Sequence, residues 1–299
     1  MLSERLTSSK DFLKSNLVSG WDFLSSSAGD YPNLGIAQRF GGAAAAYSLR
    51  DIGVNNGPVV DVRCSNGTAP FSALQVSGGA IEAFVGSGND GFVSKWYDQS
   101  GNGRHMSQSN TADQPRIVNS GTLETDPGGN PTVKFLNVGT NLGSTFLERS
   151  IIAAGETSLA YLTVSSISTT VPTRQTFNGA STDLCLNSNS MVRLRYNGSS
   201  DQHTSSLALS ANTNHLIVAS VNSSKVSTLH LDDSSQTNSS AFTGDALSLN
   251  QFLGENSDSA DGDNLGLQGT MSEMILYLGD KTDNITDIKN DMNNYYNVY

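Results

Sequence analysis

The sequence has 299 residues and a mass of 31.6 kDa, enough for one large domain with a full core. Only 15% of the residues are charged, and Ser, Thr, Asn and 29 Gly are abundant, a composition of turns and short strands that argues against a helical protein. The formal net charge of -11 repels phosphate backbones and anionic lipid, so neither nucleic acid nor a membrane is expected as a partner.

Residues 1–38 differ from the rest of the chain. No apolar run of signal-peptide or bilayer-spanning length is present, so we expect synthesis in a cytoplasm without a cleavable export sequence. Large apolar side chains recur among polar residues, and too few apolar residues lie near them in the sequence for these side chains to bury one another. We therefore predict an arm that docks on another surface, with packing on the chain's own domain as the alternative. These side chains include Leu6, Phe12, Leu13, Leu17, Trp21 and Phe23.

From residue 47 onward, short apolar runs alternate with turn residues. Residues 59–63 alternate and are followed by a turn at Asn66 and Gly67, and residues 92–97 end at a polar turn over 98–103. The further predicted strands are 132–136, 158–164, 191–196, 215–221, 226–231 and 269–277. Short strands at close spacing predict an all-β fold, a two-sheet antiparallel jelly-roll sandwich.

Two stretches interrupt the strand pattern. Residues 69–84 predict a short strand and then a turn of helix before Gly86. Near the end of the sequence, Thr282 or Asp283 is a suitable N-cap for a C-terminal helix that covers one end of the sandwich. The apolar face of that helix is predicted to consist of Ile285, Ile288, Met292 and Tyr295.

Cysteine and histidine usage indicates neither a disulfide framework nor a transition-metal site. Cys64 and Cys185 are too few for a framework, so both are predicted to be buried thiols. The four histidines lack metal-ligand spacing, and no phosphate-binding loop, nucleophile elbow or dinucleotide fingerprint occurs.

Three segments carry a resemblance to a known family. They are AYSLR (46–50), VVDVRCSNG (59–67) and GFVSKWYDQSGNGRHMSQSNTADQPRIV (91–118). Together they resemble the sandwich of fungal α-L-arabinofuranosidase B catalytic domains and, in a closer variant, structural proteins of tailed bacteriophages. Residues 270–299 resemble the closing strand and helix of the same concanavalin A-like (laminin G-like) jelly rolls. We expect an arm at 1–38 and a jelly-roll domain at 39–299.

The segment WYDQSGNG (96–103) is the most specific part of the resemblance. Trp96 and Tyr97 alternate across a strand, so one ring points into the core and the other outward. Asp98 can accept hydrogen bonds from amides in the turn that follows, which predicts a structural corner. The alternative is a sugar-binding site in which Trp96 or Tyr97 stacks on a sugar beside Asp98 and Asn102.

An acidic stretch, LGENSDSADGDN (253–264), has several possible roles. Glu255, Asp258, Asp261 and Asp263 supply the carboxylate oxygens that Ca²⁺ prefers, although their spacing is not that of an EF-hand loop. A solvated acidic loop is the simpler interpretation. Calcium is the only cofactor that the sequence suggests.

A hydrolase of the arabinofuranosidase type needs two carboxylates that face one sugar. The resemblance places the acidic stretch where these enzymes have a Gly-Asp-Asn-Ser acid motif, so Glu255 or Asp258 matches the general acid. The segment of the nucleophile has no counterpart, and the family's vicinal cysteine pair is absent. From these gaps we predict that the chain is not an enzyme.

The resemblance, the apolar arm and the lack of an export sequence together predict a virion structural protein of a tailed phage, made in the host cytoplasm. Its role would be that of a capsid decoration, tail or fibre component. The arm is expected to bind other virion proteins, and the sandwich to form a homo-oligomer and to contact host-surface glycan. The alternative function is a glycoside hydrolase of the arabinofuranosidase type.

Overall fold

The chain divides into two compact units, Met1–Leu34 and Gly35–Tyr299. The computed structural model describes residues 35–53, 57–136, 145–149, 157–168, 183–186, 191–197, 201–244, 251–253 and 267–299. The predicted arm, including Phe12 and Trp21, therefore lies almost wholly outside the described residues. The last residues assigned to it belong to the second unit, where helix α2 (Ile36–Arg39) buries Ile36.

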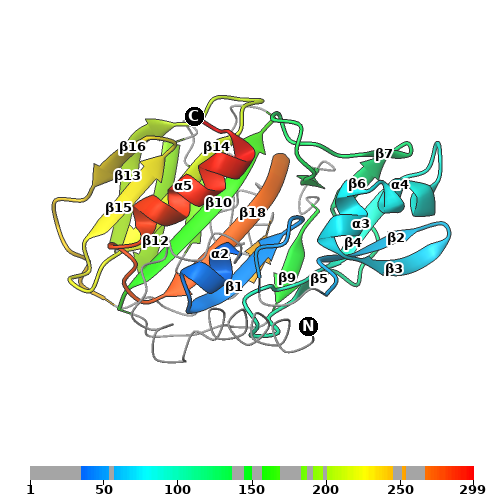
Figure 1. The fold of residues 1–299 in the computed structure, drawn as a ribbon. Coiled ribbons are helices and arrows are strands. Elements are labelled where there is room, and N and C mark those ends of the chain that lie inside the picture. The colour runs from blue at the N-terminus through cyan, green and yellow to red at the C-terminus, as the bar shows by residue number, and fades with distance from the viewer. Residues whose placement is uncertain are drawn as a thin grey trace, which may run out of the picture. The chain divides into compact units, whose positions relative to one another are not determined.

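The first sheet is antiparallel and gives the sandwich its long central strands (Figure 1). In spatial order its strands are β1 (Ala43–Ser48), β18 (Gly269–Leu278), β10 (Leu159–Ile167), β14 (His215–Val221), β15 (Ser227–Leu231) and β16 (Ser234–Thr237). Runs of Val, Ile, Leu and Thr favour these strands because β-branched and apolar side chains pack well on a pleated surface.

The second sheet is built around β4 (Gly91–Trp96). Strand β2 pairs along one edge of β4, and β5 and β6 share the other edge. The remaining strands extend from these partners. The bounds are β2 (Val60–Cys64), β3 (Gly67–Phe71), β5 (Met106–Ser107), β6 (Arg116–Asn119), β7 (Thr122–Leu123), β8 (Val133–Phe135), β9 (Leu147–Arg149) and β17 (Gln251–Leu253).

Strand β18 joins the two sheets. Its whole length pairs with β10 on one edge, while its other edge is divided between β8, at Gly269–Met271, and β1, from Glu273 to Tyr277. Hydrogen bonding is therefore continuous through 15 strands of the described chain, although these strands form two layers. The all-β sandwich predicted from the sequence is confirmed.

A separate three-stranded sheet packs against β15 and β16. It comprises β11 (Asp183–Leu186), β12 (Met191–Asn197) and β13 (Asp201–Ala208). Val192 and Tyr196 on β12 are buried in the same core as Leu229 on β15. The side chain of Cys185, predicted to be buried, lies outside the described residues, whereas Cys64 is a buried free thiol as predicted.

Among the described residues, three further helices accompany the sheets: α3 (Ala73–Ser77), α4 (Ala80–Val85) and α5 (Ile285–Tyr296). Strands β10, β14 and β18 are buried on both faces because α5 covers one face and the sandwich core the other (Figure 1). The predicted C-terminal helix is present, with Ile288 and Met292 buried. Its N-cap is Asn284 rather than Thr282 or Asp283.

Candidate functional site

The corner after β4 is held by the carboxylate of Asp98, which is only 4% exposed. One oxygen, Oδ1, accepts hydrogen bonds from the amides of Ala46 and Ser100 at 2.9 Å each. The other, Oδ2, accepts from the Ser100 hydroxyl at 2.9 Å and from the Arg104 amide at 2.8 Å. A carboxylate with four donors is fully occupied, so Asp98 fixes the chain at this corner.

Trp96 and Tyr97 alternate across the strand as the sequence predicts. Trp96 is fully buried in the core, whereas Tyr97 is half-buried and its hydroxyl donates to Asp61 Oδ1 at 2.9 Å. Burial, helped by the hydrogen bond and charge of Asp61, raises the pKa of Tyr97 to about 12. The Tyr97 ring lies 4.8 Å from the ring of exposed His105, so the outward side of the corner carries two aromatic rings.

Gln99 and Asn102 attach the same corner to β1 and to the residues after it. Asn102 donates to the carbonyl oxygens of Ala43 and Ala44 at 2.9 and 3.2 Å. Gln99 Nε2 donates to the carbonyl of Arg50 at 3.0 Å, and Gln99 Oε1 accepts from the amide of Ile52 at 3.0 Å. The segment WYDQSGNG therefore positions the backbone of residues 49–52.

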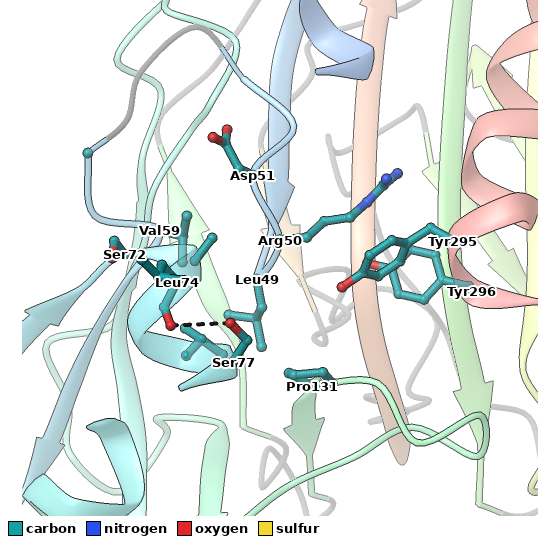
Figure 2. Close-up of a pocket in the computed structure, with 13 residues that line it drawn as sticks. Leu49, Arg50, Asp51, Val59, Ser72, Leu74, Ser77, Pro131, Tyr295 and Tyr296 are labelled. Atoms are coloured by element: carbon teal, nitrogen blue, oxygen red, sulfur yellow. Dashed lines mark hydrogen bonds between the residues drawn. The ribbon is translucent and has the colours of Figure 1, made fainter. Parts of the chain in front are cut away.

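Residues 49–51 form one wall of a pocket with a volume of about 520 Å³ (Figure 2). The other walls come from the residues just before β2, from α3, from Pro131 and from the end of α5. Leu49 and Val59 give the pocket an apolar floor, while Tyr295 and Leu74, 43% and 82% exposed, lie at its rim. In the close-up, Tyr295 and Tyr296 lie on the α5 side of the pocket, across from Leu49 (Figure 2).

Arg50 organises the side of the pocket formed by α5. Its guanidinium donates to both carboxylate oxygens of fully buried Glu273, at 2.7 and 2.9 Å, and to Asp291 at 3.0 Å. Its Cζ atom lies 4.4 Å from the centroid of the Tyr295 ring. Burial raises the pKa of Tyr295, and the positive charge of Arg50 opposes that rise. The ion pairs therefore hold a partly exposed aromatic ring in place at the rim.

Tyr296, the neighbour of Tyr295, is part of the same network but faces inward. Its hydroxyl lies 3.2 Å from Glu273 Oε2 and 3.2 Å from the carbonyl oxygen of Ser272. It is 2% exposed, whereas Tyr295, which the helical spacing assigned to the buried face, is partly exposed. The structure therefore corrects the predicted face of α5 by one residue.

The chemistry of the pocket suits a small polar molecule with an apolar face. A tyrosine ring and an apolar floor can contact the flat face of such a ligand, and Asp51 and Ser72 supply oxygen atoms for its hydroxyl groups. Asp51 is exposed, whereas Glu273 is bound by Arg50. Among the described residues that line the pocket, Asp51 is the only carboxylate.

The predicted site residues fall into two groups. Trp96, Asp98 and Asn102 are used within the corner, and Tyr97 lies on its outward side, so they do not line the pocket. The predicted calcium ligands all lie outside the described residues; they are Glu255, Asp258, Asp261 and Asp263. In the described part of the chain, no three His, Cys, Asp or Glu side chains gather as a metal site.

Sequence reasoning missed the pocket because its walls come from distant segments. Arg50 ends the segment AYSLR, but nothing in the sequence pairs it with Glu273 or with Tyr295. One signal in the sequence could have pointed to the pocket. Two tyrosines are adjacent on the last helix, and only one of them can lie on its buried face, so the other is left near the surface.

In the described residues, no helix is long and apolar enough to cross a bilayer.

No family model matches the sequence, and no curated protein matches it. Solved structures do match the fold. An arabinofuranosidase complexed with arabinofuranosyl-α-1,2-xylobiose has a TM-score of 0.59 at 18% identity. A GH54 α-L-arabinofuranosidase soaked with a cyclic sulfate inhibitor has a TM-score of 0.58 at 16% identity. Each match covers 84% of this chain, which spans 62% of the length of either enzyme.

These matches confirm the distant likeness to arabinofuranosidases at the level of the fold; they do not test the likeness to phage proteins. They also correct the prediction that the chain is not an enzyme, because the two structures above, which share its sandwich, are enzymes. That prediction rested on a missing nucleophile segment, and a match along the sequence cannot detect a carboxylate that folding brings from another strand. The described sandwich is similar to that of GH54 arabinofuranosidases.

Proposed function

We propose that this chain acts on carbohydrate as a glycoside hydrolase of the arabinofuranosidase type. The observation that carries the proposal is the likeness of the sandwich, over 84% of the chain, to arabinofuranosidase structures. The fold alone does not determine chemistry, because one fold hosts many activities. The proposal therefore depends on specific residues and on a measured turnover.

Glu255 and Asp258 are the proposed candidates for the general acid. The acidic stretch that contains them lies where the resemblance places the acid motif of the arabinofuranosidases. Glycoside hydrolysis needs one carboxylic acid to protonate the leaving oxygen and one carboxylate to attack the sugar or to activate water. The sequence offers no counterpart of the segment that carries the second carboxylate.

The direct test is hydrolysis of 4-nitrophenyl α-L-arabinofuranoside by the full chain, followed as release of nitrophenolate. Turnover that falls by about 10²-fold or more in Glu255→Gln or Asp258→Asn supports the proposal, since a general acid contributes that much. Asp261→Asn and Asp263→Asn are the matched controls, because they change the same stretch without removing the proposed acid. No turnover by the folded wild-type chain contradicts the proposal.

We further propose that the pocket beside Tyr295 holds part of the glycan. Tyr295 and Tyr299 are 43% and 46% exposed, but only Tyr295 lines the pocket, so the two tyrosines form a matched pair. Tyr295→Ala is expected to weaken the binding of arabinose-containing oligosaccharides about fivefold, as loss of a stacking ring costs about 1 kcal/mol. Calorimetric titration that finds equal losses for Tyr295→Ala and Tyr299→Ala excludes the pocket.

The predicted place of the chain in a phage particle stays a prediction. Hydrolase activity is compatible with it, because a virion protein that contacts host glycan can also cleave it. Antibody labelling of purified particles locates the chain if it belongs to a virion. The predicted arm contacts, glycan partner and homo-oligomer are tested by the same preparation, through crosslinking and mass determination.

A further inference from the structure

A serine, a histidine and an aspartate form a hydrogen-bonded series at one end of the first sheet, outside the pocket. Ser210 follows β13, His215 is the first residue of β14, and Asp232 lies in the turn between β15 and β16. The Ser210 hydroxyl lies 3.0 Å from His215 Nε2. On the other side of the ring, His215 Nδ1 lies 2.8 Å from Asp232 Oδ2.

Asp232 fixes the proton on Nδ1 of His215. A carboxylate oxygen can only accept, so Nδ1 carries the proton toward Asp232. Nε2 faces three groups of Ser210: the hydroxyl at 3.0 Å, the amide at 3.1 Å and the carbonyl oxygen at 3.3 Å. The other oxygen of Asp232 accepts from the amide of Leu216 at 2.9 Å, which holds the carboxylate against the ring. This is the tautomer in which a histidine can take a proton from a serine hydroxyl.

The nucleophile position is exposed and its backbone is anchored. Ser210 is exposed, whereas His215 is only 6% exposed. On either side of the serine, Leu209 is buried in the core and the amide of Asn212 donates to the carbonyl of Ile167 at 2.7 Å. The reacting groups are thus held by a rigid scaffold, as a catalytic constellation requires.

The residue after the serine offers a donor for a developing oxyanion. In hydrolases with a Ser-His-Asp triad, the amide that follows the nucleophile commonly fills that role. Within the described part of the chain, the amide of Ala211 donates no hydrogen bond. In the proposed reaction, this amide would bind the oxygen of a carbonyl that Ser210 attacks.

We propose that Ser210, His215 and Asp232 form a catalytic triad for the hydrolysis of esters with a small acyl group. Ser210 Oγ forms a bond to the acyl carbon and gives its proton to His215 Nε2, which passes that proton to the departing alcohol. Water then attacks the acyl-serine, His215 takes a proton from the water, and the carboxylic acid leaves as Ser210 regains its proton. This activity is independent of the proposed glycoside hydrolysis.

A second serine and histidine in the same domain provide a matched control. His203 Nδ1 lies 3.1 Å from the Ser227 hydroxyl, so the two groups repeat the serine–histidine contact. Both are buried, at 5% and 0% exposure, so an ester cannot reach Ser227. If contact between a serine and a histidine were enough for reaction, both Ser210 and Ser227 would react. The proposed triad predicts reaction at Ser210 alone.

The test is covalent labelling of the full chain by a fluorophosphonate, which forms an Oγ–P bond and releases fluoride, with the modified residue located by mass spectrometry. One label on Ser210 is expected, absent in Ser210→Ala, unchanged in Ser227→Ala, and formed about 10²-fold more slowly in Asp232→Asn. Hydrolysis of 4-nitrophenyl acetate should follow the same order among the variants.

Melting curves confirm that each variant is folded, and Ser210→Ala removes only an exposed hydroxyl, so loss of labelling in it reports chemistry. An unlabelled, folded wild-type chain overturns the proposal and leaves the three residues as a structural clamp at the end of the sheet. Labelling of Ser210 that is equally fast in Asp232→Asn also overturns it, because the aspartate then plays no part.

Discussion

At the scale of single residues, buried polar side chains hold the corner and the pocket wall in place. Asp98 joins β1 to the turn after β4, and Gln99 joins the same turn to the residues around Arg50. The sequence allowed the corner to be predicted because Asp, Asn and Gly in this order are typical of turns. It did not reveal that the donors to Asp98 include Ala46, since that contact depends on the pairing of distant strands.

Asp98→Ala is expected to lower the free energy of unfolding by about 2–3 kcal/mol, because the amides of Ala46 and Arg104 lose their acceptor. Urea denaturation measures this as a lower midpoint with an unchanged slope. Asp51→Ala is the control, since exposed Asp51 should cost about 0.5 kcal/mol or less. Equal midpoints for the two variants would show that the corner contributes nothing to stability.

His230 is expected to make stability depend on pH. Burial and the nearby charge of Lys289 lower its pKa from 6.5 to about 4 in the folded chain. Between these values the unfolded chain binds more protons, so the free energy of unfolding falls as the pH drops from about 6.5 to about 4.

His230→Gln removes this contribution. The difference in unfolding free energy between the wild type and the variant, measured at several pH values, is expected to change across that window and to be constant above it. Taking the difference between wild type and variant cancels the contribution of carboxylates that titrate in the same pH range, because both chains contain them. A difference that is constant from pH 4 to pH 7 would refute the assignment.

At the scale of elements, several strands could be predicted from the sequence because apolar and β-branched residues form short runs between turn residues, whereas strands such as β1 and β13 were not predicted. Strand β14 has the predicted bounds, β2 and β4 are each shifted by one residue, and β18 extends one residue further than predicted. The division of one edge of β18 between β1 and β8 could not be predicted, because it depends on which strands meet in space. The pocket could not be predicted from the sequence for the same reason.

Gly269 is required at the start of β18, where it pairs with Ile167 at the end of β10. A methyl group at this position would lie 1.9 Å from the carbonyl oxygen of Ser166, so Gly269→Ala is expected to destabilise the fold by about 3 kcal/mol or more. Gly41→Ala is the matched control, because no atom lies within 4 Å of the corresponding methyl group. Thermal melting compares the two, and similar melting temperatures would contradict this account of β18.

At the scale of the whole molecule, the boundary between the two units decides what can be removed. Deletion of residues 1–34 should leave a soluble domain that melts cooperatively, since residues 35–299 form a compact unit. Deletion of residues 1–40 also removes Ile36 and Phe40, which are 1% and 5% exposed, and each is worth about 1.5–3 kcal/mol when buried. Scanning calorimetry should find a lower melting temperature for the second truncation than for the first.

The result of the first truncation also tests the predicted arm. If removal of residues 1–34 alone causes aggregation or a large loss of stability, that segment contributes to the core of the domain. If the truncated domain is stable but no longer assembles with its partners, the segment is an arm. Size-exclusion chromatography with light scattering separates the two outcomes.

The pairing of β1 with β18 has a consequence for synthesis on the ribosome. Ala43 is translated long before Tyr277, its partner across the sheet, so the nascent chain must carry an unpaired β1 while the rest of the domain is made. The run of four alanines in β1 presents little apolar surface during that delay, which limits wrong pairing with other nascent chains. Completion of the first sheet is therefore a late event, reached only when the final strand has emerged.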